Sequence, residues 1–183
     1  MTEELMIRHA APTLAGLKTG SLFSCHYEDK TALYDNVRRF NRILVPRGMR
    51  IIPLLLRRGR ALIYLYRPER LKADLSRDEA VKLLADCGYL RTDGERSIVE
   101  LINRLKKTGT FPHEIGLFLS YPVEDVKGFM LHRGRNSKYT GDWKVYGDTA
   151  GAIRQFHKYR KCKEVYSRVY ASGTPLERLA VAG

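Results

Sequence analysis

Two β-prone runs joined by a short basic turn occupy residues 49–67, which read MRIIPLLLRRGRALIYLYR. The four residues from Arg57 to Arg60 have the length and the glycine of a hairpin turn, so the runs Met49–Leu56 and Ala61–Arg67 are predicted to pair antiparallel. Pro53 lacks the N–H donor that a sheet ladder needs, which places the first run at an edge. Both alternate sets of side chains in the second run are apolar, which indicates that both of its faces are covered.

The remaining periodicity surrounds this hairpin with helices and adds strands at Ser21–Tyr27 and Asp142–Gly147. Ser76-x-x-Glu79 and Thr92-x-x-Glu95 are typical capping boxes, each predicted to open a helix. Other helices are predicted at 2–9, 29–45, 112–119, 122–131 and 149–170. We therefore expect an α+β fold in which helices pack on a small, mainly antiparallel sheet of about four strands. Residues 1–171 should form one domain, and 172–183 a tail or a short edge strand.

Length and composition favour an ordinary globular protein. A chain of 183 residues that is 44% hydrophobic is long enough to bury one core. No apolar run approaches the roughly 20 residues of a membrane-spanning helix, and the N-terminus lacks the charge and the apolar segment of a secretory signal. The three cysteines, Cys25, Cys87 and Cys162, lie too far apart for a metal knuckle and suit reduced thiols. These features predict a cytoplasmic protein without a membrane segment.

The net charge of +13 is concentrated in two stretches of the chain. Residues 30–70 contain eleven Lys and Arg against two acids, and residues 127–168 contain eleven against three. Arginine supplies ten of the first eleven, and its planar fork suits phosphate better than lysine does. This pattern predicts an anionic partner, either a nucleic acid or a phosphorylated small molecule, and the alternative is that the cations only coat solvent-exposed helix faces. The residues expected to bind it are Arg57, Arg58, Arg60, Arg154, Lys158 and Lys161.

Tyrosines are interleaved with these cations and suggest base stacking, although filling the core is the better interpretation of the tyrosines taken alone. The ones concerned are Tyr34, Tyr64, Tyr66, Tyr139 and Tyr159.

A second hypothesis is an enzyme or cofactor site. His113 and Glu114 lie in the first turn of a predicted helix, where an imidazole beside a carboxylate suits general base catalysis. A structural role, with Glu114 capping the helix and His113 tying neighbouring turns, is the favoured interpretation of the pair. Asp125 lies in the first turn of the next helix, where an acid either caps the helix N-terminus or takes part in the site. Lys144 and Tyr146 share one strand face and present a cation and a phenol together. This reading requires the five side chains to converge on one pocket.

Several other kinds of site are disfavoured by the sequence. Leu117 stands where the zinc signature H-E-x-x-H needs its second histidine, so no metal site is predicted. Neither the Walker nor the dinucleotide glycine motif occurs. Cys25 and His26 are adjacent on a predicted strand and so face opposite ways, which separates a thiol from its base. A protein-interaction subunit with an acidic partner remains a third hypothesis, and the sequence leaves open the enzymatic activity, the cofactor and the oligomeric state.

One stretch resembles a known family signature. It reads Phe111-Pro112-His113-Glu114-Ile115-Gly116-Leu117-Phe118-Leu119 and continues through Tyr121-Pro122 and Glu124-Asp125-Val126-x-Gly128-Phe129. Further matches include Tyr64-x-Tyr66-Arg67, Cys87-Gly88-Tyr89 and Gly141-x-Trp143-Lys144-Val145-Tyr146. The chain resembles the bacterial family catalogued as domain of unknown function 3793. That resemblance covers most of the chain and implies no activity, because the family has none established.

Overall fold

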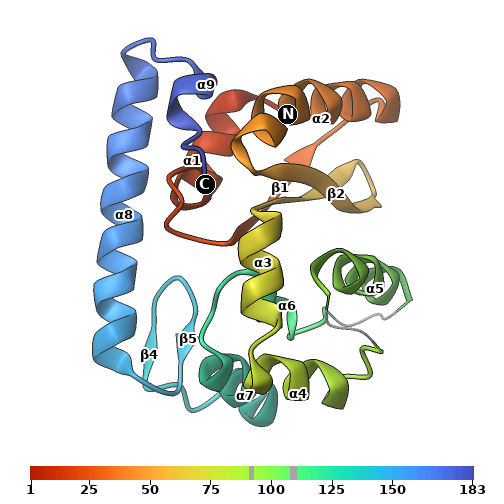
Figure 1. Cartoon of the computed structure of the whole chain (residues 1–183), viewed down its shortest axis with the longest axis vertical. Coiled ribbons are helices and arrows are strands. Elements are labelled where there is room, and N and C mark those ends of the chain that lie inside the picture. The colour runs from red at the N-terminus through yellow and green to blue at the C-terminus, as the bar shows by residue number, and fades with distance from the viewer. Residues whose placement is uncertain (91–92, 108–110) are drawn as a thin grey trace. The chain divides into compact units, whose positions relative to one another are not determined.

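The computed structural model describes residues 1–90, 93–107 and 111–183 and confirms an α+β protein (Figure 1). The chain divides into two compact units: unit 1 comprises residues 1–69 and 161–183, and unit 2 comprises residues 70–160. The elements of unit 1 are α1 (Glu3–Leu14), β1 (Gly20–His26), α2 (Lys30–Leu44), the 3-10 turn η1 (Val45–Arg47), β2 (Arg50–Arg57), β3 (Arg60–Tyr66) and α9 (Leu176–Leu179). The elements of unit 2 are α4 (Asp78–Asp86), α5 (Gly94–Lys107), α6 (Ile115–Phe118), α7 (Val123–His132), β4 (Tyr139–Thr140) and β5 (Lys144–Val145). Two helices contribute residues to both units, namely α3 (Pro68–Leu75) and α8 (Thr149–Ala171).

The sheet of unit 1 has three antiparallel strands in the order β1-β3-β2. The predicted hairpin is confirmed: β2 is an edge strand that carries Pro53, and β3 is the central strand. Arg58 has φ 48° and Gly59 has φ 74°, which are the two left-handed positions of a type I′ turn. Asn, Asp or Gly normally occupies the first of these positions, so an arginine there is unusual.

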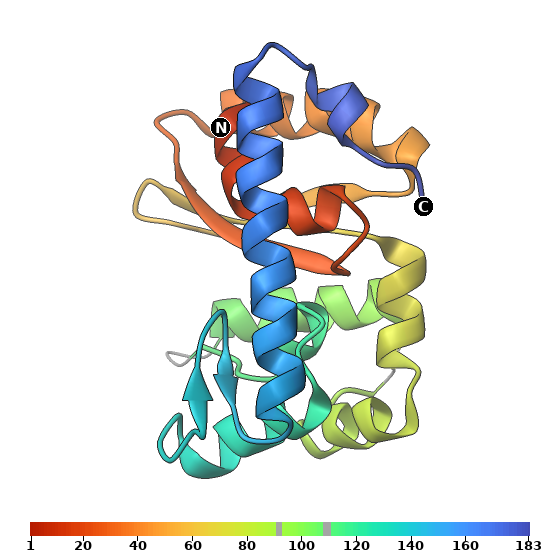
Figure 2. The ribbon, with the colours of Figure 1, turned by 90° about the vertical axis from the view of Figure 1, so that its left-hand side faces the viewer.

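One face of this sheet forms the core of unit 1 together with α1 and α2. Both views show these helices on the same side of the sheet (Figures 1 and 2). Alternation along each strand decides which side chains face them, since Phe23, Ile51 and Ile63 point inward from the three strands. The helices contribute apolar residues at helical spacing, namely Met6, Ile7, Ala10 and Leu14 from α1 and Leu33, Val37, Phe40 and Leu44 from α2.

The prediction for Asp142–Gly147 as a fourth strand of the main sheet was wrong. Only Lys144–Val145 is extended, and it pairs with Tyr139–Thr140 in a separate two-stranded ribbon. Closing a ribbon between neighbouring residues costs far less chain entropy than reaching a distant sheet. In unit 2 this ribbon lies beside the first half of α8 (Figure 2), and Trp143 and Val145 pack there against Ala152, Phe156 and Tyr159.

Some helix boundaries also differ from the prediction. The first helix, α1, does not end at His9 but continues through Pro12 to Leu14. Ser76 does not open α4, because its hydroxyl donates to the carbonyl of Lys72 and closes α3, a helix that the sequence pattern did not indicate. Residues 172–183 contain the short helix α9 and no strand, and Leu176 and Leu179 of that helix are buried in the core of unit 1. The capping box expected at Thr92 lies outside the described residues.

Candidate functional site

Three exposed arginines gather at the β2–β3 turn and are called the hairpin cluster: Arg57, Arg58 and Arg60. In the strand register Arg57 stands directly opposite Arg60, and Arg60 stands directly opposite His26 of β1. Residues directly opposite each other project from the same sheet face, so the side chains of Arg57, Arg60 and His26 form one row across three strands. This face is the one turned away from α1 and α2, because Ala61, the next residue, lies in the core.

The guanidinium of Arg60 is held in place from β1. Its Nε and Nη2 atoms donate to the Ser24 hydroxyl at 3.2 and 3.1 Å. Two bonds to one oxygen fix the plane of the guanidinium, so less side-chain entropy is lost when a partner binds. Sequence reasoning missed both Ser24 and His26, because only the long-range pairing of β1 with β3 places them beside the turn.

No carboxylate of the described residues neutralises the charges of the hairpin cluster. Across the residues that the structure describes, Arg57, Arg58 and Arg60 form no ion pair with a carboxylate. The arginines of α2 contrast with them, since Arg38 pairs with Asp35 at 2.9 Å and Arg39 with Glu3 at 3.7 Å. Like charges directly opposite each other in a sheet are destabilising, so the row of Arg57 and Arg60 lowers the stability of the hairpin.

A second group of cations lies along α8 and is called the α8 stripe: Arg154, Lys158 and Lys161. The spacing of four and three residues places them on one helix face, and all three are exposed. They too lack ion pairs within the described part of the chain. The structure thus keeps all six predicted cations at the surface, three at the hairpin turn and three on one face of α8.

The interleaved tyrosines divide into two groups. Tyr64, Tyr66 and Tyr159 are buried, and the rings of Tyr64 and Tyr66 stack at 4.8 Å between their centroids. Only Tyr34 and Tyr139 are exposed, at 41% and 43%. Core packing is therefore the role of the three buried tyrosines, and base stacking by them is excluded.

In unit 2, Asp125 binds the segment that follows β5. The residue is only 2% exposed, and its carboxylate accepts from the Trp143 indole at 2.7 Å and from the backbone N–H groups of Tyr146 and Gly147 at 2.7 and 2.9 Å. Glu124 accepts from the next N–H, that of Asp148, at 3.3 Å. Asp125 does not cap its own helix. Its buried charge is stabilised by three donors.

Glu114 occupies a second buried polar cluster of unit 2. Its carboxylate accepts from the Tyr89 hydroxyl at 3.2 Å and lies 3.8 Å from Nη1 of Arg104, whose guanidinium also covers the Tyr89 ring. Burial, reinforced by the Glu114 carboxylate, raises the pKa of Tyr89. Glu114 therefore links α6 to α5 and does not cap α6.

The other three predicted site residues have separate environments in unit 2. The exposed His113 meets the Phe129 ring edge-on, with ring centroids 4.8 Å apart. Lys144 donates from Nζ to the carbonyl of Gly134, just beyond the C-terminus of α7, where a cation is favoured. The Tyr146 ring stacks on His132, and its buried hydroxyl has no hydrogen-bond partner among the described residues. A shared catalytic role for the five residues stays a prediction.

Glycines in the family-like stretch allow close packing within unit 2. A Cβ added at Gly128 would lie 2.3 Å from Cγ of Tyr146, and one at Gly116 would lie 2.7 Å from a methyl of Val126. A Cβ at Gly141 would lie 2.3 Å from the Phe156 ring. Such distances are far below van der Waals contact, so only glycine fits without displacement. The signature thus specifies the packing of α6, α7 and the ribbon.

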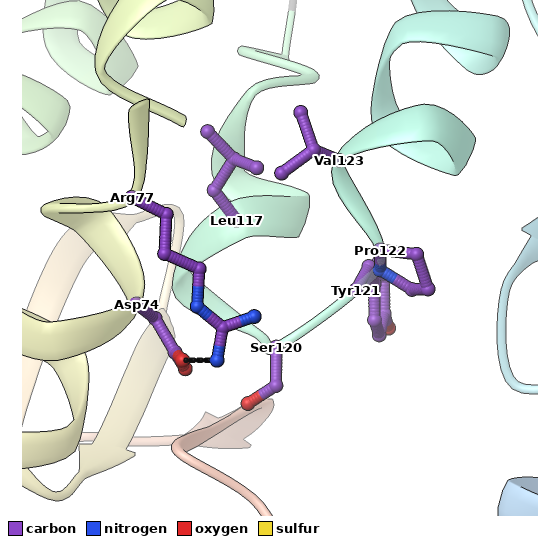
Figure 3. A pocket seen from close by; sticks show the side chains of 7 residues that line it. All are labelled: Asp74, Arg77, Leu117, Ser120, Tyr121, Pro122 and Val123. Atoms are coloured by element: carbon purple, nitrogen blue, oxygen red, sulfur yellow. Dashed lines mark ion pairs between the residues drawn. The ribbon is translucent and has the colours of Figure 1, made fainter. Parts of the chain in front are cut away.

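Two neighbouring cavities open beside the N-termini of α4 and α7 in unit 2. The first, about 280 Å³, contains the ion pair of Asp74 and Arg77, joined at 3.0 Å, together with Ser120 and Tyr121 (Figure 3). The second, about 370 Å³, is lined by Arg77, Asp78, Glu79, Pro122, Val123 and Glu124. In the first cavity Asp74 already pairs with the guanidinium of Arg77, and in the second three carboxylates outnumber that guanidinium, so neither lining favours an anion. None of the five predicted catalytic residues lines either cavity.

The thiols are held in their protonated form. Burial raises the pKa of Cys25, and it raises the pKa of Cys162 to about 11. Burial and then the Glu114 carboxylate raise the pKa of Cys87. Thiolate is the reactive species, so nucleophilic chemistry at these three residues is disfavoured.

Within the described ranges, no cluster of three or more His, Cys, Asp or Glu side chains is arranged to hold a metal ion. None of the described helices combines the length and the apolar character needed to cross a membrane.

Fold and surface define a basic α+β protein with an arginine-tipped β-hairpin. Residues 6–180 match the model of the family described as protein of unknown function DUF3793, so the chain belongs to that family. No curated protein and no solved structure matches the chain.

Proposed function

We propose that this protein binds an anionic partner, a nucleic acid or a phosphorylated molecule, through the hairpin cluster. The observation that supports this most is that two arginines repel each other and have no carboxylate beside them in the described chain. Arg57 and Arg60 face each other across a strand pair without a neutralising carboxylate in the described chain. An arriving phosphate would remove their repulsion and form charge-assisted hydrogen bonds.

The turn itself supports the same proposal. Arg58 occupies a left-handed position that Asn or Gly would fill with less strain. Neither Asn nor Gly, however, would place a guanidinium at the tip of the hairpin. The cations of the α8 stripe are exposed as well, and we propose that they also contact anionic groups.

Inorganic polyphosphate provides the direct test. We define the hairpin triple variant as Arg57→Gln, Arg58→Gln and Arg60→Gln, and the control triple variant as Arg8→Gln, Arg38→Gln and Arg39→Gln. Both lose three positive charges, but each arginine of the control is already paired with a carboxylate, at 3.4, 2.9 and 3.7 Å. Calorimetric titration at low salt should show binding by the wild type and by the control, and a loss of at least tenfold in the hairpin triple variant. Equal losses in both variants would contradict the proposal.

A second candidate function is a cofactor or enzyme site in unit 2, and one observation favours it. The Tyr146 hydroxyl is buried without a partner among the described residues, and such groups normally find one. A bound ligand would provide it. Thermal unfolding in the presence of common phosphorylated cofactors tests this, since a true ligand stabilises the wild type and fails to stabilise Tyr146→Phe.

A further inference from the structure

The hairpin cluster has the geometry of a site for a linear polyanion. We infer that its partner is a nucleic acid, held by its sugar–phosphate backbone with little dependence on base sequence; this rests on the proposed function. Three properties of the hairpin cluster support a nucleic acid: the length of the row, the exposure of the surface and the use of arginine.

Spacing is the first argument. Arg57, Arg60 and His26 occupy adjacent strands in one row, and neighbouring strands lie about 4.8 Å apart, so the row extends about 10 Å. One strand of a nucleic-acid duplex carries a charge about every 3.4 Å along its axis. A row of this length is therefore longer than the spacing of the charges along one nucleic-acid strand. A single phosphate group would engage only part of it.

Surface shape is the second argument. A small phosphorylated molecule is usually bound in a concave pocket that buries most of its surface. The three arginines are exposed at the end of a sheet. An open row of charges binds weakly per contact and gains affinity by repeating contacts along a polymer.

The choice of cation is the third argument. All three members of the hairpin cluster are arginine, whose fork binds two phosphate oxygens at once. Ser24 engages Nε and Nη2 of Arg60, which leaves the Nη1 hydrogens without a partner in the described chain. Contacts of this kind fix register on a backbone and carry no base information, so sequence preference should be small.

Salt dependence gives the decisive measurement. Fluorescence anisotropy with labelled single-stranded DNA and with duplex DNA of unrelated sequences should show binding that weakens as salt rises from about 50 mM to about 200 mM. Each arginine that contacts a phosphate contributes about 0.7 to 0.9 to the slope of log K against log salt. The hairpin triple variant should therefore lose about 2 to 3 units of slope, and the control triple variant should keep its slope.

The arms of the experiment separate the two proposals. Polyphosphate binding that depends on the hairpin, without DNA binding, would overturn the nucleic-acid inference and leave the proposed function standing. Binding of neither at low salt would end both. Tighter binding of polyglutamate than of DNA would overturn the inference in favour of an acidic protein. Strong preference for one base sequence would contradict the backbone mode.

A lysine variant checks the role of the guanidinium fork. Replacing the hairpin cluster by three lysines keeps the charge and removes the bidentate geometry. If the arginines contact the nucleic-acid backbone, the lysine variant should keep the slope of log K against log salt and bind several-fold more weakly. Full retention of affinity would show that charge alone acts, and a lost slope would contradict phosphate contact by these three positions.

Discussion

The charged side chains at the hairpin turn of unit 1 lack internal partners, whereas the carboxylate that binds the segment after β5 in unit 2 has several. At the hairpin, Arg57 faces Arg60 and no carboxylate of the described chain compensates either of them. After β5, the single carboxylate of Asp125 accepts from three donors and is almost completely buried. A buried charge whose hydrogen bonds are made within the protein contributes to stability. An exposed charge without an internal partner is free to bind another molecule.

The family-like stretch and the hairpin cluster lie in different parts of the sequence. The family-like stretch from Phe111 to Phe129 supplies Asp125, Glu114 and two of the closely packed glycines of unit 2, Gly116 and Gly128. The hairpin cluster lies outside that stretch. We conclude that the most distinctive part of the sequence encodes folding of unit 2, whereas the surface proposed to bind a partner is encoded by a less distinctive turn.

The largest effect should come from removing the buried carboxylate. Asp125→Ala leaves the Trp143 indole and two backbone N–H groups without their acceptor, and we expect a loss of about 3 kcal/mol in the free energy of unfolding. Urea denaturation measures it. The exposed Asp86→Asn is the control and should change stability by less than about 0.5 kcal/mol. A small effect at Asp125 would remove the contrast between the two regions.

A smaller loss is expected from filling a glycine contact. Gly128→Ala drives a methyl group into the Tyr146 ring, and overpacking should lower the free energy of unfolding by about 2 kcal/mol despite the better helix propensity of alanine. Gly94→Ala in α5, where a Cβ would meet nothing closer than 3.4 Å, should cost little or nothing in the same denaturation assay. Equal behaviour of the two variants would show that close packing does not explain the signature glycines.

Removing the unpartnered hydroxyl should have the opposite sign. Tyr146→Phe relieves the desolvation of a buried hydroxyl that lacks a hydrogen bond in the described chain, so the free energy of unfolding should rise by about 1 kcal/mol. Thermal and urea unfolding without ligand measure the change. A loss of stability would mean that the hydroxyl has a partner, which would weaken the second candidate function.

The smallest effect concerns the repulsion at the hairpin. Arg57→Gln removes one of two directly opposed charges, and we expect a stabilisation of about 0.5 kcal/mol at low salt that fades as salt increases. Arg38→Gln breaks an existing pair with Asp35 and should instead cost a few tenths of a kcal/mol. Destabilisation by Arg57→Gln would show that the hairpin arginines are structural and would count against the proposed function.

The sequence by itself determined the elements whose signals are local. Periodicity specified α2, the β2–β3 hairpin and α8, because side chains on one face must share one environment. It also identified Arg57, Arg58 and Arg60 as one group, since a two-residue turn necessarily brings them together. It misassigned Asp142–Gly147, since an alternating pattern does not specify which strand will be its partner.

Only the tertiary structure decided the environments of polar side chains. Glu114 and Asp125 looked like helix caps or catalytic acids, and folding gave them partners 25 and 18 residues away, Tyr89 and Trp143. Ser24 and His26 reached the arginine row through pairing of β1 with β3. Backbone periodicity follows from local geometry, whereas neutralisation of a charge depends on groups that the chain brings together over long distances.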